Sequence, residues 1–136
     1  MEISFIDDKS KNLSAWLAGM EPICGKNANL TVYQSVDEFE EALDEGYQPN
    51  IVFTDYNIDD RFGTEIVELL RQMFGHQVYI IAHSSDQWRN EHLLQIGANE
   101  IIPKYKGVSP SPTLGERFWS IDDLEELCKE GLEEEE

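Results

Sequence analysis

Short apolar runs alternate along the chain with longer segments in which apolar residues recur at helical spacing. Such alternation is typical of βαβ units that build a parallel sheet. The predicted strands are Ile3–Ile6, Leu30–Tyr33, Asn50–Thr54, Val78–Ala82 and Glu100–Pro103. The pattern therefore predicts an α/β fold, a doubly wound five-stranded parallel sheet with helices on both faces.

A helix is predicted after each strand. Ser35 and Glu38 form a capping box at the start of the second helix, and Asp86 can cap the fourth, which runs to Gly97. The third helix is expected over 64–73 and the last over 120–132. The stripes expected to face the core are Leu13, Trp16, Leu17 and Met20 in the first helix, Ile66, Leu69, Leu70 and Met73 in the third, and Ile121, Leu124, Cys128 and Leu132 in the last.

Two strands also indicate their place in the sheet. Asn50–Thr54 is continuously apolar and β-branched, as a central strand buried on both faces should be. The fifth strand ends in Pro103, which lacks a backbone donor and therefore favours an edge position.

The length of 136 residues and the 40 % hydrophobic content are those of one domain with one sizeable core. The interpretation is a single domain over 1–136, with a core over 2–106, a long loop over 107–119, the last helix over 120–132 and an acidic tail over 133–136. Because a helix C-terminus disfavours anions, the tail is expected to fray.

Charge and composition exclude several classes of function. Lys and Arg number 10 against 28 Asp and Glu, a formal net charge of -18, which argues against direct binding to nucleic acid. No segment approaches the roughly 20 consecutive apolar residues of a membrane span, so a soluble cytoplasmic protein with no membrane contact is predicted. Cys24 and Cys128 have no CxxC spacing and are interpreted as reduced thiols.

Charged residues follow three of the predicted strands. Asp7 and Asp8 come after the first strand, Asp55 after the third and Lys104 after the fifth. Ligands of an open parallel sheet bind beyond the carboxyl ends of its strands, where the strand order reverses. Crowded carboxylates repel one another unless a cation lies among them, and an all-oxygen ligand set favours Mg²⁺. Carboxylates are known covalent acceptors of phosphoryl groups, so Asp55 is the candidate acceptor and Lys104 the candidate phosphoryl contact.

These residues stand in recognisable motifs. The acidic pair lies within Phe5–Lys9 and the candidate acceptor within Ile51–Asn57, and Gly63, Gly97-Ala98 and Lys104 follow at matching separations. With these residues the chain resembles the CheY-like receiver domains of two-component response regulators over about 2–106.

The resemblance implies a flavodoxin-like strand order of 2-1-3-4-5 and phosphorylation of Asp55 by a histidine kinase or phosphotransfer protein. It implies that Asp8 and Asp55 bind Mg²⁺ directly, that Asp7 acts largely through water, and that the backbone carbonyl of Asn57 completes the metal site. Lys104 would contact the phosphoryl group.

The chain departs from the family at the residues that transmit phosphorylation. Ala82 occupies the position of a Ser or Thr that ends the fourth strand, and Ile101 occupies that of an aromatic residue in the fifth. Ser84 could replace the missing hydroxyl if the loop there is short. The usual Lys-Pro pair is reversed as Pro103-Lys104, so the cis peptide expected in the family cannot be assumed.

Three hypotheses follow. The leading one is a receiver that passes a signal by protein–protein contact and is not an enzyme in the usual sense. The second is a pseudo-receiver that docks partners without phosphorylation, motivated by Ala82 and Ile101. The third is a Mg²⁺-dependent phosphatase, which is disfavoured because Asn57 stands where such hydrolases carry a second carboxylate. The cognate kinase, the downstream partner and homodimer formation stay open.

Overall fold

The computed structural model describes residues 1–104, 118 and 120–133, so most of the predicted long loop and of the acidic tail lies outside the described residues. The elements, in chain order, are β1 (Glu2–Ile6), α1 (Ser10–Cys24), β2 (Asn29–Tyr33), α2 (Val36–Asp44), β3 (Ile51–Thr54), β4 (Asn57–Ile58), β5 (Arg61–Phe62), α3 (Gly63–Phe74), the 3-10 turn η1 (Gly75–Gln77), β6 (Tyr79–Ala82), α4 (Gln87–Ile96), β7 (Glu100–Ile101) and α6 (Ile121–Glu133).

The main sheet has five parallel strands in the order β2-β1-β3-β6-β7. Counted along the main sheet alone, this is the predicted order 2-1-3-4-5, and the predicted fold class is confirmed. β3 is the central strand, and all four of its residues are buried. β7 is an edge strand, as Pro103 indicated, but it is only two residues long.

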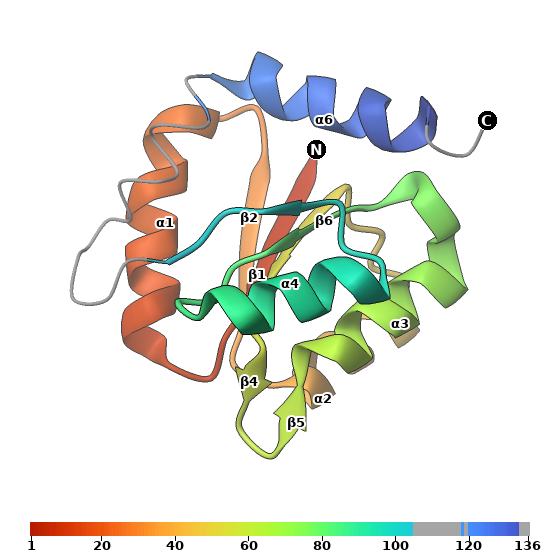
Figure 1. Cartoon of the computed structure of the whole chain (residues 1–136). Coiled ribbons are helices and arrows are strands. Elements are labelled where there is room, and N and C mark those ends of the chain that lie inside the picture. The colour runs from red at the N-terminus through yellow and green to blue at the C-terminus, as the bar shows by residue number, and fades with distance from the viewer. Residues whose placement is uncertain (105–117, 119, 134–136) are drawn as a thin grey trace.

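The alternation of side chains along the strands creates two cores, one on each face of the sheet. Figure 1 shows helices on both sides of the sheet. Phe5, Phe53 and Ile81 face α1 and α6. Val52 and Ile80 lie in the other cluster, which includes apolar residues of α2, α3 and α4. Both faces of the central strands are therefore covered, which explains why these strands are almost continuously apolar.

A short hairpin that the sequence did not predict follows β3. β4 and β5 pair antiparallel, with Asn57 opposite Phe62 and Ile58 opposite Arg61. Asp59 at the turn has a positive φ of 61°, a conformation that Asp and Asn tolerate better than most residues. Arg61 forms ion pairs with carboxylates of α2 and α3, which fasten the hairpin to the body of the domain: Asp37, Glu40 and Glu65.

Two predicted core positions are wrong. Met73 is 45 % exposed and Leu132 is 50 % exposed, because each lies to the side of the stripe that its helix buries. The buried stripes are Ile66, Val67 and Leu70 in α3 and Leu124, Leu127 and Gly131 in α6. In α6 the core position is taken instead by Leu127, which is buried with Leu124. No helix among the described residues is long and apolar enough to span a membrane.

Candidate functional site

The sheet itself places Asp7 and Asp55 beside each other. β1 ends at Ile6 and β3 at Thr54, and these two residues are register partners. The hydrogen-bond ladder continues one step further, with Asp7 N donating to Tyr33 O at 3.1 Å and Asp55 N donating to Ile6 O at 3.1 Å. Because the strand order reverses between β1 and β3, both aspartates lie where open α/β sheets place their ligand sites.

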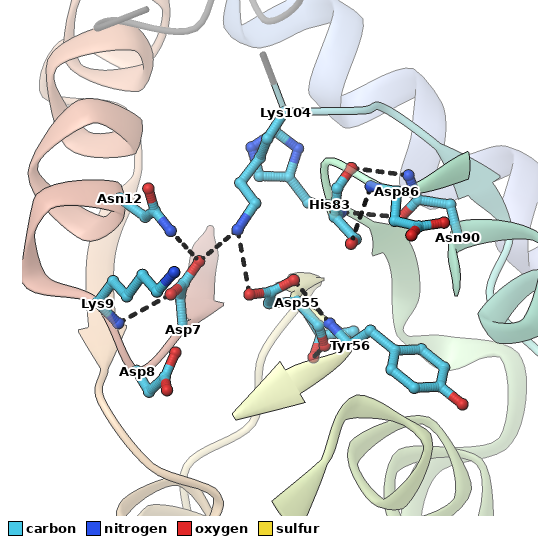
Figure 2. Close-up of polar contacts among 12 residues, drawn as sticks. Asp7, Asp8, Lys9, Asn12, Asp55, Tyr56, His83, Asp86, Asn90 and Lys104 are labelled. Atoms are coloured by element: carbon cyan, nitrogen blue, oxygen red, sulfur yellow. Dashed lines mark hydrogen bonds and ion pairs between the residues drawn. The ribbon is translucent and has the colours of Figure 1, made fainter. Parts of the chain in front are cut away.

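Three carboxylates converge there. Each of Asp7, Asp8 and Asp55 offers one oxygen, and these three oxygens lie within 4.8 Å of one another. Figure 2 shows the three side chains turned toward a common space beyond the strand ends. Asp7 is fully buried, Asp55 is half-buried and Asp8 is exposed, so the cluster is open to solvent on the side of Asp8.

Lys104 brings the single cationic side chain that contacts this cluster among the described residues. Its Nζ lies 2.7 Å from Asp7 Oδ2 and 3.1 Å from Asp55 Oδ2. Its backbone N–H donates to Ser84 O at 3.1 Å, which fixes the chain after β7 against the end of β6. One ammonium faces three carboxylates, so the cluster keeps an excess of negative charge.

Asp7 is held by several donors. Its Oδ1 accepts from Lys9 N at 2.9 Å, and its Oδ2 accepts from Asn12 Nδ2 at 3.0 Å as well as from Lys104. Sequence reasoning missed Asn12, whose one signal is that it lies five residues after Asp7 in the first turn of α1. The Asp7 carboxylate therefore accepts from three donors, and one of them, Lys104, also reaches Asp55.

Asp8 is positioned by the unpredicted hairpin. Its Oδ2 accepts from the backbone N–H of Asp59 at 3.1 Å. Asp59 and Asp60 themselves are exposed, as expected for solvated loop residues. Asp59 therefore contacts Asp8 through its backbone N–H, and no residue pattern in the sequence predicts this contact.

Asp55 lies in an unfavourable environment for a bare carboxylate. Burial raises its pKa, the Lys104 ammonium opposes that rise, and the nearby Asp7 adds to it. Its Oδ1 accepts from Tyr56 N at 2.8 Å, while Oδ2 faces Lys104. The ionised form would gain from an additional positive charge in the cluster.

Gly63 allows the backbone of Asp55 to pass close to the start of α3. A Cβ on Gly63 would lie 2.0 Å from Asp55 O, a distance no real contact reaches. Gly63 N donates to Tyr56 O at 2.7 Å, and Thr54 Oγ1 donates to Asp55 O at 2.9 Å. The main chain around Asp55 is thus fixed on both sides.

His83 follows β6 but belongs to the core. It is buried, with its ring edge-on to Phe5 and Phe53. Its Nδ1 bonds the backbone carbonyl of Ile102, and burial lowers its pKa to about 4. His83 is therefore a neutral packing residue at physiological pH.

The chemistry of the donor set suits a hard divalent cation. The cluster Asp7, Asp8 and Asp55 offers carboxylate oxygens and no His or Cys, the choice that favours Mg²⁺ or Ca²⁺ over zinc. Asn57 begins β4, two residues after Asp55, and the expected contribution of its carbonyl to a metal site stays a prediction.

Comparisons with known proteins identify relatives of the fold among solved structures. No family model matches the chain, and no curated protein sequence matches it. Among solved structures, a CheY-like response regulator receiver domain protein from Methanospirillum hungatei JF-1 superposes with a TM-score of 0.71 at 19 % identity, over 98 % of this chain and 97 % of that one. This chain has the CheY-like receiver fold.

Two further receiver-fold structures support the assignment. The beryllofluoride-activated receiver domain of DrrB matches with a TM-score of 0.68 and 17 % identity, over 91 % of this chain and 97 % of that one. A putative response regulator from Chloroflexus aurantiacus matches with a TM-score of 0.71 and 14 % identity, over 94 % and 97 % respectively.

Within this receiver fold the two atypical residues are neighbours. Ala82 and Ile101 are register partners on β6 and β7, so a methyl group and an aliphatic side chain occupy adjoining strands beside the site. Ser84, the candidate replacement hydroxyl, accepts a hydrogen bond from Asp86 N at 3.3 Å in the loop that leads to α4. Its backbone N–H and carbonyl are both bonded by the Asn90 side chain at 2.8 Å.

Proposed function

We propose that this chain is a phosphoacceptor receiver domain in which Asp55 takes a phosphoryl group from a phosphohistidine of a partner kinase or phosphotransfer protein. The observation that supports this best is the convergence of Asp7, Asp8 and Asp55 within 4.8 Å, with Lys104 bridging two of them. A receiver fold would hold these residues at the ends of its strands, where such domains bind their ligands.

In the proposed reaction a carboxylate oxygen of Asp55 attacks the phosphorus of the phosphohistidine. The new O–P bond makes an acyl phosphate, while the P–N bond breaks and its electron pair stays on the imidazole. Lys104, now 3.1 Å from Asp55 Oδ2, would transfer its contact to a phosphoryl oxygen. Asp7 would keep the ammonium in place throughout, because its Oδ2 lies 2.7 Å from Lys104 Nζ.

Mg²⁺ is the proposed cofactor. Asp8 and Asp55 would bind it directly, Asp7 largely through water, and the Asn57 carbonyl would complete its protein ligands. The bound ion would neutralise charge on the phosphoryl oxygens, which is the main requirement of phosphoryl transfer. The exposed side of the cluster at Asp8 leaves room for the waters that Mg²⁺ retains.

The proposed output is contact with another protein in the cytoplasm, not turnover of a substrate. The net charge of -18 favours a partner with a basic surface and disfavours direct binding to nucleic acid. The proposal names no downstream protein and no oligomeric state; both are to be measured.

A second candidate function is supported by a specific observation. Ala82 and Ile101 form an aliphatic pair where the family transmits the signal, which favours a pseudo-receiver that docks partners in a fixed state. Such a module would bind its partner equally well with and without phosphorylation of Asp55.

The direct experiment is incubation with acetyl phosphate and Mg²⁺ followed by intact mass measurement, with Asp55→Asn as the control. The proposal predicts addition of one phosphoryl group to the wild-type chain and none to the variant. Asp60→Asn, an exposed carboxylate outside the cluster, serves as the matched control and should be labelled like the wild type. No labelling of the wild-type chain, or equal labelling of Asp55→Asn, would leave the pseudo-receiver.

A further inference from the structure

Tyr56 connects the candidate acceptor to the surface of α4. Its backbone N–H donates to Asp55 Oδ1 at 2.8 Å. Its side chain points away from the carboxylate cluster, as Figure 2 shows, and its hydroxyl lies 2.7 Å from His92 Nδ1 on α4. One residue thus has a hydrogen bond to Asp55 at one end and a hydrogen bond to α4 at the other.

The ring of Tyr56 lies within an aromatic cluster, defined here as Tyr56, Phe62, Trp88 and His92. Ring centroids are 5.9 Å apart for Tyr56 and Phe62, 6.0 Å for Tyr56 and Trp88, and 5.9 Å for Trp88 and His92. Trp88 is 65 % exposed and Phe62 is 48 % exposed. The cluster therefore joins the β4–β5 hairpin to α4 and presents large rings to solvent.

We propose that Tyr56 is the positioning residue that reports the state of Asp55 to α4, in place of the hydroxyl and ring that Ala82 and Ile101 lack. This inference rests on the proposed function, because it needs Asp55 to change its chemical state. The backbone of Tyr56 is held by Asp55 Oδ1 through its N–H and by Gly63 N through its carbonyl.

Phosphorylation must alter the first of these contacts. When Asp55 becomes an acyl phosphate, its charge-bearing carboxylate is replaced by a neutral carbonyl oxygen and an ester-type oxygen. The hydrogen bond from Tyr56 N to Oδ1 then loses its charge-assisted strength, whichever oxygen is modified. A shift of the Tyr56 main chain moves its ring against Trp88 and its hydroxyl against His92, both on α4.

The experiment follows the indole N–H resonance of Trp88 in wild-type protein with Mg²⁺, before and after saturation with beryllofluoride. The chain has three Trp residues, and Trp88→Phe assigns the signal. In His92→Ala, which removes the partner of the Tyr56 hydroxyl, the ligand-induced shift is expected to fall below about half of the wild-type value, because the hydrogen-bonded link is gone. Tyr56→Phe tests the same bond from the other side.

Tyr79→Phe is the matched control. Its hydroxyl also bonds a side chain, Glu100 at 2.8 Å, but β6 begins at Tyr79, whereas the carboxylate cluster lies at the opposite end of the strands. The Trp88 shift in this variant should equal that of the wild type. Measuring a ligand-induced difference at saturation separates coupling from stability, because a purely structural role would change the free and bound spectra alike.

The outcomes distinguish this inference from the proposed function. If beryllofluoride shifts resonances at Asp8 and Asp55 but the Trp88 signal moves equally in wild type, His92→Ala and Tyr56→Phe, Tyr56 is not the link, and the acceptor function stands. A wild-type Trp88 signal that does not move at saturation also overturns the inference alone. If no resonance in the carboxylate cluster responds, both proposals fail.

Discussion

The site around Asp55 and the neighbouring side of the domain, formed by β6, β7 and α4, are built from different kinds of contact. Around Asp55, charged side chains at strand ends hold one another: Lys104 reaches Asp7 and Asp55, and Asp8 accepts from Asp59 N. Beside it, Ala82 and Ile101 offer only apolar surface. The contact from the Asp55 site to α4 joins residues far apart in the sequence, Tyr56 and His92.

A receiver fold can therefore carry an acidic cluster at its strand ends while apolar residues occupy the neighbouring positions Ala82 and Ile101. The proposed phosphoryl-binding site needs only a few charged residues at strand ends, and such residues converge here. Transmission of a signal would need a polar or aromatic link between the site and a surface. Ala82 and Ile101 provide no such link. Substitutions in each region test the two separately.

The largest expected effect is at Gly63, on the side of the acid site. Gly63→Ala forces a Cβ against Asp55 O, which would lie at 2.0 Å, so we expect a loss of about 3 kcal/mol in the free energy of unfolding. Urea denaturation measures it. Gly131→Ala in α6 is the comparison, because its Cβ would lie 3.3 Å from His76 O, a tight contact that a shift of a few tenths of an ångström relieves, and alanine favours helix. Equal stability of the two variants would show that the close approach at Asp55 is not required.

On the α4 side, substitution of Asn90 should lower the free energy of unfolding nearly as much. Its side chain is fully buried and bonds both the N–H and the carbonyl of Ser84 at 2.8 Å. Asn90→Ala leaves both backbone groups without this partner and should cost about 2 kcal/mol in unfolding free energy. Gln87→Ala, an exposed position on the same helix, should change it by less than about 0.5 kcal/mol. A small effect at Asn90 would mean that the loop before α4 is held by other contacts.

His83 gives the region after β6 a pH dependence. Its pKa of about 4 in the folded chain lies below the roughly 6.5 of an unfolded histidine, so the unfolded state binds more protons between these values. Stability is therefore lost as the pH falls through this window, by about 2 kcal/mol between pH 8 and pH 5. Unfolding free energies of wild type and His83→Phe are measured at both pH values. The variant should lose less stability between pH 8 and pH 5 than the wild type does. An identical pH slope in the variant would show that other groups cause it.

Binding of Mg²⁺ at the acid site should change the free energy of unfolding by less than the substitutions above. At a tenfold excess over its dissociation constant, a cation that binds only the folded chain adds about 1.4 kcal/mol to the unfolding free energy. Asp55→Asn should lose most of this gain, whereas the exposed control Asp60→Asn should keep it. Urea denaturation with Mg²⁺ and with EDTA measures the gain. The same gain in Asp55→Asn would place the cation elsewhere on the acidic surface.

The sequence predicted the strands and the convergence of the charged residues because both depend on local patterns, whereas the strand order followed from the resemblance to receiver domains. Apolar runs define the strands, and a residue that follows a parallel strand must lie at the carboxyl edge of the sheet. Asp7, Asp55 and Lys104 are therefore brought together by the fold as expected. The roles assigned to these three residues, to Asp8 and Asn57 and to the metal stay predictions.

Other features could not be predicted because no periodic pattern marks them. The β4–β5 hairpin has strands of two residues each, too short for alternation to be visible. The bond between Tyr56 and His92 joins side chains 36 residues apart. The burial of Met73 and Leu132 was predicted wrongly because the apolar residues of each helix allow more than one stripe at helical spacing, and the buried stripe includes Val67 in α3 and Leu127 in α6.

The most direct test of the acceptor role of Asp55 is binding of beryllofluoride in the presence of Mg²⁺, followed by fluorine NMR on wild type and Asp55→Asn. Beryllofluoride imitates a phosphoryl group on a carboxylate, so the wild-type chain should bind one equivalent and Asp55→Asn none. Omission of Mg²⁺ should abolish the bound signal in the wild type as well. Absence of a bound signal in the wild type with Mg²⁺, or its persistence in Asp55→Asn, would contradict a phosphoacceptor site at Asp55.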